Sequence, residues 1–310
     1  MRLAAFTIGD LGKASSRLRS FYLFRHASSS NIEVLRNISY QEACSCQIIH
    51  LQKIMDFQIF FWLIVWRTNR INIIYDLDDQ PGSFKAKLGF MLAIFLSNTL
   101  TVDTSSRKQY WKKIFPRKNV VIIPDIADKK ENIKNISPRI NTDPSINFFW
   151  LGHHENISSI ETSFSVIRNL NSRLIICTNL VEIDENSLKK WPIDFLQWRE
   201  DIVFSSLNLN SFMILSHNHD EDSIYKSSNK MVLAILAGFI PIISRTPEYE
   251  SLAKELDLEF LLFDEFSEVP LIAQRASSTN WPIVLTNCQL RLDEMYSSKA
   301  VLNIFLNQCI

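Results

Sequence analysis

The sequence predicts an α/β protein made of two Rossmann-like, doubly wound domains that face a cleft. Short apolar runs of strand length alternate with longer amphipathic stretches, which is typical of βαβ units built around a parallel sheet. This rhythm appears twice along the 310 residues, a length that fits two domains. Between the two halves lies a polar segment, Lys129–Asn147, with two prolines and no apolar periodicity. We expect the domain boundary there.

The first half contains six runs of strand type and four of helix type, and we assign residues 1–140 to an N-terminal domain. The strands are expected at Arg2–Ile8, Ile32–Leu35, Gln47–Leu51, Asn72–Asp76, Thr99–Val102 and Val120–Ile123. The helices are expected at Lys13–Phe24, Asp56–Thr68, Phe84–Leu96 and Ser105–Phe115. Pro116 and Pro124 fit as the ends of elements, because proline neither continues a helix nor donates to a strand ladder.

The second half repeats the pattern, and we assign residues 146–287 to a C-terminal domain. The strands are expected at Phe148–Leu151, Leu174–Cys177, Phe212–Leu215, Ile240–Ser244 and Leu261–Phe263. The helices are expected at Asn156–Asn169, Arg199–Ser206, Ser228–Ala237 and Pro247–Leu256, with a last one from Cys288 to Leu306. In doubly wound sheets ligands bind beyond the carboxyl ends of the strands.

The composition limits the compartment and the partners. The 33 basic and 33 acidic side chains balance, so the chain lacks the basic excess of a general nucleic-acid binder. Its five cysteines are scattered, which favours reduced thiols and a cytoplasmic location. The N-terminus reaches Asp10 too early for a secretory signal, and the longest apolar runs fall short of the roughly 20 residues of a spanning helix. The sequence is compatible with peripheral contact with the inner face of the plasma membrane.

The segment Ser216–Tyr249 carries the most functional information. It reads as a strand end, a polar loop, a helix, a Gly-x-x-Pro turn, a second strand and the start of another helix. Three consecutive residues are good N-caps for the first helix: Ser227, Ser228 and Asn229. A helix N-terminus binds phosphate through free amides and the helix dipole, and Lys226 and Lys230 flank this one. The alternative interpretation is an ordinary capped helix with two solvated lysines.

Lys230, the apolar helix to Ala237–Gly238 and Pro241 before an apolar strand resemble the donor-site helix of GT-B glycosyltransferases. In that family a Lys or Glu at this spacing precedes an A-x-G-x-P-V-I segment, and the helix start holds the donor diphosphate. Further segments resemble bacterial members that build surface polysaccharides, in family order. They are Gly9-x-x-Gly12 with residues 14–19, Ile-His-Leu-Gln-Lys at 49–53, Ile-Tyr-Asp-Leu-Asp-Asp at 74–79 and, more weakly, Phe149–Gly152 with Asn156.

The resemblance implies a metal-independent transfer of a sugar from a nucleotide sugar to a glycan or lipid-linked acceptor, with no further cofactor. It places the donor diphosphate at Lys226, Ser227, Ser228, Asn229, Lys230, Arg17 and Arg19. It places the nucleotide or sugar at Gly152, His153, Asn156, His217, Glu248 and Tyr249, and the acceptor side at Gly12, Ser15, Ser16 and Asp78. The expected catalytic groups are Lys226, for the leaving group, and a carboxylate base, for which Asp10 ranks before Asp78 and Asp79 because it lies in a loop between a strand and a helix. Residues 288–310 are implied to pack back on the N-terminal domain.

Three alternatives stay open. Many retaining members carry a Glu-x7-Glu pair, but the corresponding positions hold Tyr225 and Leu233, which leaves the stereochemistry open and leaves room for a catalytically inactive GT-B-like subunit. Asp76-Leu77-Asp78 matches the DxD motif with which GT-A glycosyltransferases hold a divalent metal. The third alternative is a metal-dependent hydrolase built on the polar cluster His217, His219, Asp220 and Asp222.

Overall fold

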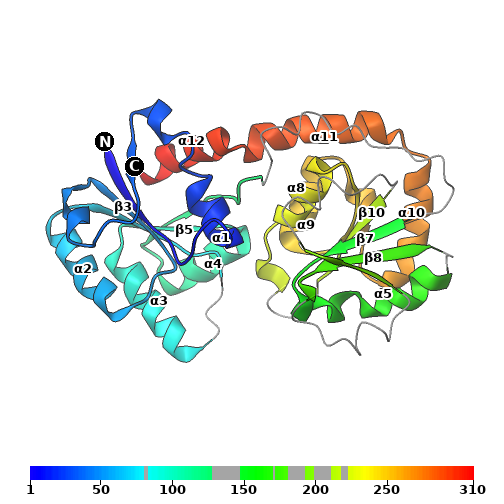
Figure 1. Ribbon diagram of the computed structural model, residues 1–310, viewed down its shortest axis with the longest axis horizontal. Coiled ribbons are helices and arrows are strands. Elements are labelled where there is room, and N and C mark those ends of the chain that lie inside the picture. Colours follow the sequence, from blue (N-terminus) through cyan, green and yellow to red (C-terminus); the bar gives the residue numbers. More distant parts are fainter. Residues whose placement is uncertain (80–82, 128–146, 170–171, 181–192, 199–210, 218–222) are drawn as a thin grey trace. The chain divides into compact units, whose positions relative to one another are not determined.

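The computed structural model describes residues 1–79, 83–127, 147–169, 172–180, 193–198, 211–217 and 223–310 (Figure 1). The chain forms two compact units. Unit 1 comprises Met1–Asp128 and Asp293–Ile310, and unit 2 comprises Lys129–Leu292. The predicted linker at Lys129–Asn147 and the predicted helix Arg199–Ser206 lie outside the described residues, except for Asn147. No helix among the described residues is long and apolar enough to cross a membrane.

Unit 1 is built on a six-stranded parallel sheet with the order β2-β1-β3-β4-β5-β6. Its strands are β1 (Arg2–Phe6), β2 (Glu33–Leu35), β3 (Ile48–Gln52), β4 (Asn72–Asp76), β5 (Thr99–Val102) and β6 (Asn119–Ile122). The chain leaves β1 toward β2 on one side and returns to β3 on the other. The topological switch point therefore lies between β1 and β3, and a ligand crevice is expected at their carboxyl ends.

Alternate strand residues of unit 1 pack into two cores, one on each face of the sheet. Helices α2 (Phe57–Thr68), α3 (Phe84–Leu96) and α4 (Ser105–Ile114) cover one face, as right-handed crossovers in one direction require. Their N-caps are side chains that accept from the amide three residues on: Asp56, Ser83 and Thr104. On the other face α12 (Ser298–Cys309) inserts Val301, Leu302 and Phe305 against residues of β1, β3 and β4.

The first helix differs from its prediction. Instead of one α-helix over Lys13–Phe24, the chain forms a short α-turn, α1 (Ala14–Ser16), followed by a π-helix over Arg17–Phe21. The Tyr22 amide donates to the Arg17 carbonyl at 2.8 Å, five residues back. Four consecutive side chains, from Arg17 to Ser20, are buried in this way. Single π-turns of this kind are common at functional sites.

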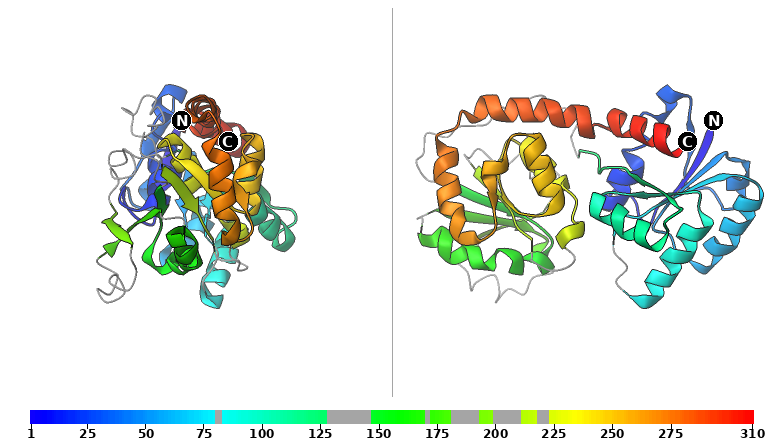
Figure 2. Two further views of the ribbon diagram at one scale, coloured as in Figure 1. Left: turned by 90° about the vertical axis from the view of Figure 1, so that its right-hand side faces the viewer. Right: turned by 180° about the vertical axis from the view of Figure 1, so that it is seen from behind.

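Unit 2 holds a second six-stranded parallel sheet, with the order β12-β11-β10-β7-β8-β9. Its strands are β7 (Asn147–Leu151), β8 (Arg173–Thr178), β9 (Asp194–Gln197), β10 (Ser211–Leu215), β11 (Ile240–Ser244) and β12 (Leu262–Phe263). The helices are α5 (Ser158–Asn169), α8 (Asn229–Leu236), α9 (Pro247–Glu255), α10 (Val269–Ser277) and α11 (Trp281–Tyr296). The switch point here lies between β7 and β10. Figure 2 shows the helices of this unit packed around its sheet.

Three further elements differ from their predictions. Strand β9 and helix α10 were not expected. The single helix predicted for Cys288–Leu306 is two helices, α11 and α12, because Ser297 is extended (φ −63°, ψ 150°) and its side chain accepts from the Ala300 amide. Serine favours this N-cap geometry, so the second helix starts afresh at Ser298.

Candidate functional site

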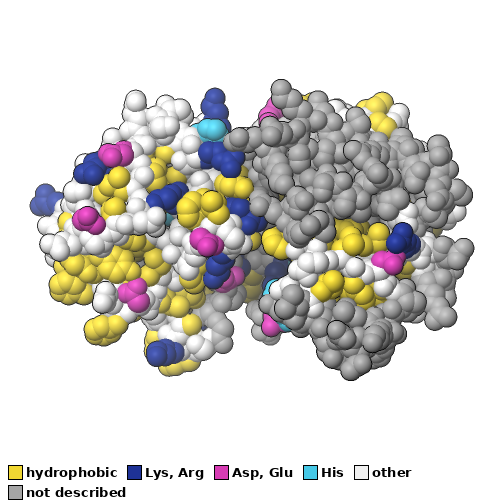
Figure 3. Space-filling model, viewed as in Figure 1, with side chains coloured by type: hydrophobic (Ala, Val, Ile, Leu, Met, Phe, Trp, Pro, Cys, Tyr) yellow, Lys and Arg dark blue, Asp and Glu magenta, His cyan; other side chains and the backbone are white. Residues whose placement is uncertain are grey.

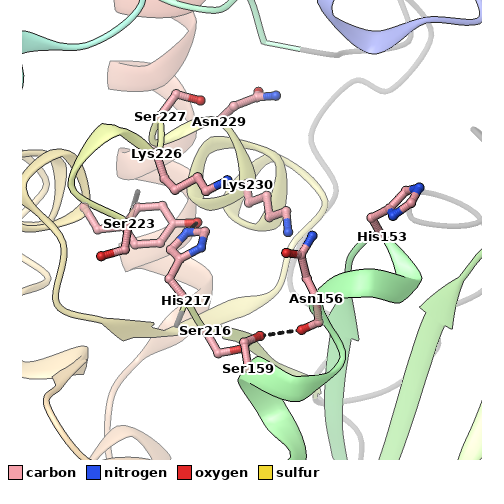
Figure 4. A pocket seen from close by; sticks show the side chains of 11 residues that line it. His153, Asn156, Ser159, Ser216, His217, Ser223, Lys226, Ser227, Asn229 and Lys230 are labelled. Atoms are coloured by element: carbon pink, nitrogen blue, oxygen red, sulfur yellow. Dashed lines mark hydrogen bonds between the residues drawn. The ribbon is translucent and has the colours of Figure 1, made fainter. Parts of the chain in front are cut away.

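A pocket of about 440 Å³ lies at the carboxyl ends of β7 and β10, at the switch point of unit 2. Polar side chains from the loops after both strands and from the start of α8 surround it (Figure 4). They are His153, Asn156, Ser159, Ser216, His217, Ser223, Lys226, Ser227, Asn229, Lys230 and Tyr249. None of these described residues is acidic, and two of them are lysines.

Lys226, in the loop before α8, and Lys230, in the first turn of α8, extend into the pocket (Figure 4). Lys230 Nζ lies 5.7 Å from the centre of the Trp150 ring, within cation–π range. Burial, and then the charge of Lys226, lower the pKa of Lys230 to about 8. A cation that is costly to hold in the empty pocket would be stabilised by a bound anion.

His217 and Tyr249 form an uncharged pair against the lysines. Their rings stack with centres 5.2 Å apart, and His217 Nε2 lies 3.2 Å from the Tyr249 hydroxyl. Burial, together with Lys230 and Lys226, lowers the pKa of His217 to about 3. The imidazole is therefore neutral at pH 7 and can exchange hydrogen bonds with a ligand without adding charge.

A chain of hydrogen bonds fixes the floor of the pocket. Trp150 Nε1 donates to Ser216 Oγ at 3.0 Å, and Ser159 Oγ donates to the Asn156 carbonyl at 2.7 Å. Because the Ser159 proton is used in that bond, Ser216 donates across the 2.9 Å contact to Ser159 Oγ, drawn as a dashed line in Figure 4. The carboxyl end of β7, the loop after β10 and the start of α5 are thereby held together.

Gly152 is required by its close contact with Trp150. A Cβ atom at this position would lie 2.3 Å from Trp150 Cη2. We therefore expect Gly152→Ala to destabilise the protein by about 1–3 kcal/mol, the usual cost of overpacking, and to weaken ligand binding in the pocket. Urea unfolding measures the first effect. Gly12→Ala is the control, because the added methyl there meets only the Asp10 carboxylate tip at 3.1 Å. Equal costs for the two variants would contradict this role for Gly152.

The pocket brings together eight of the residues predicted to bind the donor: Lys226, Ser227, Asn229, Lys230, His153, Asn156, His217 and Tyr249. Five others do not line it, of which Arg17 and Arg19 belong to unit 1 and are described below. Ser228 is the N-cap residue of α8, although its side chain makes no capping hydrogen bond. Gly152 lies under Trp150, and Glu248 lies in the first turn of α9.

Sequence reasoning missed four residues of this site: Ser159, Ser216, Ser223 and Trp150. Ser216 directly follows β10, and Ser159 lies about one helical turn after Asn156. These positions could have indicated that the residues belong to the site, since groups that follow parallel strands lie together at one edge of the sheet. Asn229 adds a buried side-chain oxygen, Oδ1, with no hydrogen-bond partner among the described residues.

In unit 1 the segments that carried the family resemblance meet at the carboxyl ends of the strands. Arg19 binds both oxygens of Asp76, through Nε at 2.8 Å and Nη2 at 2.6 Å. Its Nη1 donates to the Ile123 carbonyl at 2.8 Å and to Asp125 at 3.0 Å. The Arg19 side chain is 1% exposed. Because its guanidinium is committed within unit 1, Arg19 does not fit the predicted contact with a diphosphate, and we assign it a structural role.

Lys53 and its carboxylates form a second cluster at the same edge. Lys53 Nζ lies 2.7 Å from Asp78 and also pairs with Asp79. The predicted acceptor residue Asp78 is thus ion-paired, with its side chain 10% exposed. Both carboxylates of the Asp76-Leu77-Asp78 motif are neutralised by cations of the protein. The two six-stranded parallel sheets also differ from the single nucleotide domain expected for GT-A enzymes, so that alternative is wrong.

The remaining N-terminal candidates lie in the loop after β1 and in the turn that follows. Asp10 is exposed, and its Oδ1 accepts from the Gly12 amide at 2.9 Å. Ser16 is buried and accepts from the Gly9 amide at 3.2 Å, whereas Ser15 is half-buried. Arg17 is buried and donates to the Leu11 carbonyl at 2.9 Å. These residues shape the loop at the switch point of unit 1.

One group of metal-ligand type lies among the described residues. Ligand atoms of His153, His154 and Glu155 lie within 4.8 Å of one another, and His153 also lines the pocket. The three residues are consecutive, and His153 and Glu155 are exposed. Of the histidine cluster considered for a hydrolase, His219, Asp220 and Asp222 lie outside the described residues. A metal-free site stays a prediction.

No protein-family model and no curated protein matches the chain. Solved structures do. The glycotransferase of kitacinnamycin aligns with a TM-score of 0.56 at 9% identity, over 100% of this chain and 99% of its own. The UDP-GlcNAc 2-epimerase from Neisseria meningitidis, bound to UDP-GlcNAc, aligns with a TM-score of 0.54 at 12% identity, over 99% and 100%. The glycosylation associate protein (Gap123) complex from Streptococcus agalactiae aligns with a TM-score of 0.53 at 14% identity, over 84% of this chain and 54% of that chain.

At these identities the similarity shows the fold. The chain has the two-domain parallel α/β fold of GT-B glycosyltransferases, which confirms the predicted fold class. The same fold also serves an epimerase, so the reaction has to be argued from the site.

Proposed function

We propose that the protein transfers a sugar from a nucleotide sugar to an acceptor, and that the donor diphosphate binds in the pocket of unit 2. The main support is that Lys226 and Lys230 both line a pocket whose described lining has no carboxylate. Clefts lined by one sign of charge concentrate ligands of the opposite sign. The position at the switch point of a doubly wound sheet is where nucleotides bind in other proteins.

In the proposed reaction the bond between the anomeric carbon and the diphosphate oxygen breaks, and that oxygen keeps the electron pair. The acceptor oxygen forms the new bond to the anomeric carbon and gives its proton to a base. Lys226, Lys230 and the first amides of α8 stabilise the charge on the leaving diphosphate. His217 and Tyr249 supply neutral hydrogen bonds to the nucleotide or sugar, and no metal is required.

We keep Asp10 as the candidate base, because it is exposed in the loop after β1, at the carboxyl edge of the unit 1 sheet. We propose a glycan or lipid-linked acceptor on the side of unit 1, in surface polysaccharide synthesis in the cytoplasm. Asp78 is a weaker candidate for acceptor contact, since Lys53 already neutralises it.

A second candidate function is a GT-B-like subunit that binds a nucleotide sugar without transferring it. The positions of the Glu-x7-Glu pair hold Tyr225 and Leu233, and one structural neighbour is a glycosylation associate protein complex. Donor binding without turnover of any acceptor would favour this function over transfer.

The test is a thermal-unfolding screen of the full chain with UDP, GDP, dTDP, ADP and CMP and their sugars, with and without EDTA. A ligand at a hundred times its dissociation constant should stabilise the fold by about 2.7 kcal/mol. Release of free nucleotide in the presence of candidate acceptors then reports turnover. If no nucleotide raises the melting temperature in EDTA, the metal-free donor site is refuted.

Binding of a nucleoside diphosphate should weaken as the pH rises through about 8, the lowered pKa of Lys230. Below that pH Lys230 is charged in the empty pocket, and above it a proton must be taken up on binding. Affinity should fall about tenfold from about pH 7 to about pH 9, while the ligand stays ionised because its terminal phosphate has a pKa of about 6. Titration calorimetry at the two pH values measures this. The same slope in Lys230→Ala would contradict the assignment.

A further inference from the structure

Helices α2 and α3 carry an apolar surface that is open to solvent. Seven large apolar side chains are exposed there, and we call them the α2–α3 surface: Phe57, Phe61, Ile64, Phe84, Leu88, Leu92 and Phe95. Phe57 is 91% exposed and Phe84 is 77% exposed. Figure 3 shows hydrophobic side chains gathered over these helices, at the lower left of the view. Contiguous apolar surfaces of this kind mark sites of interaction.

Each of the two helices has a buried apolar face that packs on the core, and the exposed apolar residues form a second face. In α2 the side chains of Ile59, Leu63 and Trp66 are buried in the core of unit 1, while Phe57 and Phe61 lie outside it. In α3 the buried set is Phe90, Ala93 and Ile94, and the exposed residues recur every three or four positions from Phe84 to Phe95. A helix at the surface of a soluble domain usually has a single apolar stripe. Both helices here have two.

A groove of about 450 Å³ runs between the two helices. It is lined by Met55, Phe60, Leu88, Gly89 and Leu92, with Lys85 among its polar residues. A Cβ on Gly89 would lie 3.2 Å from Met55 Sδ, so the glycine lets Met55 pack closely against α3. Its volume is in the range of small-molecule sites and its lining is largely apolar.

The surroundings of the α2–α3 surface are basic. From Asp56 to Lys118 the sequence has five acidic residues, of which Asp76, Asp78 and Asp103 are held in buried or nearly buried ion pairs. The other two, Asp56 at the N-cap of α2 and Asp79, are exposed. The exposed cations of the same stretch are Arg67, Arg70, Lys85, Lys113 and Arg117. They belong to α2, α3, α4 and the adjoining loops, which cover the same face of the sheet.

We propose that the α2–α3 surface docks on an anionic lipid bilayer, with Phe57 and Phe84 inserted among the lipids and the groove receiving part of an acyl chain. Helices that lie on a membrane combine apolar aromatic residues with a basic rim, and each Lys or Arg near an anionic surface adds about 1 kcal/mol. The charge imbalance favours this occupant over a second copy of the chain, whose basic rims would repel each other. The inference concerns unit 1 and does not rest on the donor pocket.

The test is co-sedimentation of the full chain with vesicles of phosphatidylcholine, with and without phosphatidylglycerol. The wild type should bind the anionic vesicles and bind neutral ones far less. Phe57→Ser with Phe84→Ser should weaken binding by about tenfold or more, because each buried phenyl side chain adds about 1.5–3 kcal/mol. Lys85→Gln should weaken it about fivefold, and high salt should do the same. The control is Ile283→Ser, which changes an exposed apolar residue of α11.

Several results would overturn the proposal. They are no binding to either vesicle, equal binding to both, or equal binding by the double Phe variant and the Ile283→Ser control. A concentration-dependent dimer that the double Phe variant abolishes would assign the surface to a second copy instead. Because Phe57 and Phe84 are exposed, their replacement should leave the melting temperature and nucleotide-induced stabilisation unchanged. That control separates failure of this proposal from failure of the donor site.

Discussion

Arg19→Ala should destabilise the protein by about 3–5 kcal/mol, because it leaves the buried Asp76 carboxylate without its cation. Arg19 makes two hydrogen bonds to Asp76, and Thr101 Oγ1 donates a third to the same carboxylate at 2.6 Å. Burial raises the pKa of Asp76, but Arg19 and the hydrogen bonds outweigh it and hold the pKa below its ordinary value. Urea unfolding of wild type and variant at pH 7 gives the difference in the free energy of unfolding.

The matched control is Arg173→Ala, which removes an arginine from an ion pair with Asp194 whose side chains are 60% and 49% exposed. We expect a cost of at most about 1 kcal/mol there, as for other surface pairs. The pH dependence of the free energy of unfolding provides a second check, because the direction of the change can be predicted. A depressed carboxyl pKa stabilises the fold above the unfolded pKa of about 3.9, and this contribution is lost as the pH falls through the lower folded value. Equal costs for the two arginine variants would remove the structural role given to Arg19.

Lys230→Ala should weaken nucleoside diphosphate binding about tenfold to a hundredfold. A hydrogen bond to a charged group contributes about 1.5–3 kcal/mol, and each 1.4 kcal/mol is a factor of ten. At a ligand concentration that stabilises the wild type by about 2.7 kcal/mol, the variant should gain less than about 1.4 kcal/mol. Without ligand the variant should be as stable as the wild type or more stable, because burial penalises the Lys230 charge.

Lys254→Ala is the control for this experiment, since Lys254 is exposed on α9 and does not line the pocket. It removes the same charge from unit 2 and should leave ligand-induced stabilisation unchanged. An equal loss in both variants would mean that the effect comes from the overall charge. Stabilisation that persists in Lys230→Ala would place the anion elsewhere.

Most strands and helices could be predicted because their signals are local. Asn72–Asp76, Thr99–Val102 and Ile240–Ser244 were predicted with the bounds that the structure shows, since apolar runs between turn residues define buried parallel strands. Helix α3 was also predicted with its observed bounds, from Phe84 to Leu96. The break at Ser297 was missed, because serine is common both inside helices and at their caps, and only its extended backbone shows which role it takes.

The candidate site was predictable in part for the same reason. Lys226, Asn229 and Lys230 belong to one continuous segment, so their joint position at a helix start follows from the sequence. Ser159, Ser216 and Trp150 belong to separate elements, and their hydrogen bonds exist only once β7, β10 and α5 are in place. The ion pairs of Arg19 could not be predicted for the same reason, since Asp76 and Asp125 are far from Arg19 in the sequence.

The sequence alone determined the succession of βαβ units, the polar boundary between the two halves and the helix start with its two lysines. These features rest on periodicity, capping and turn chemistry, which act over a few residues. The tertiary structure decided which charges are neutralised and which are available. Arg19 is held by carboxylates inside unit 1, while Lys230 faces a pocket without an acidic partner among the described residues. Ion pairing and burial depend on neighbours that are distant in sequence, and these fix the pKa of each charged group.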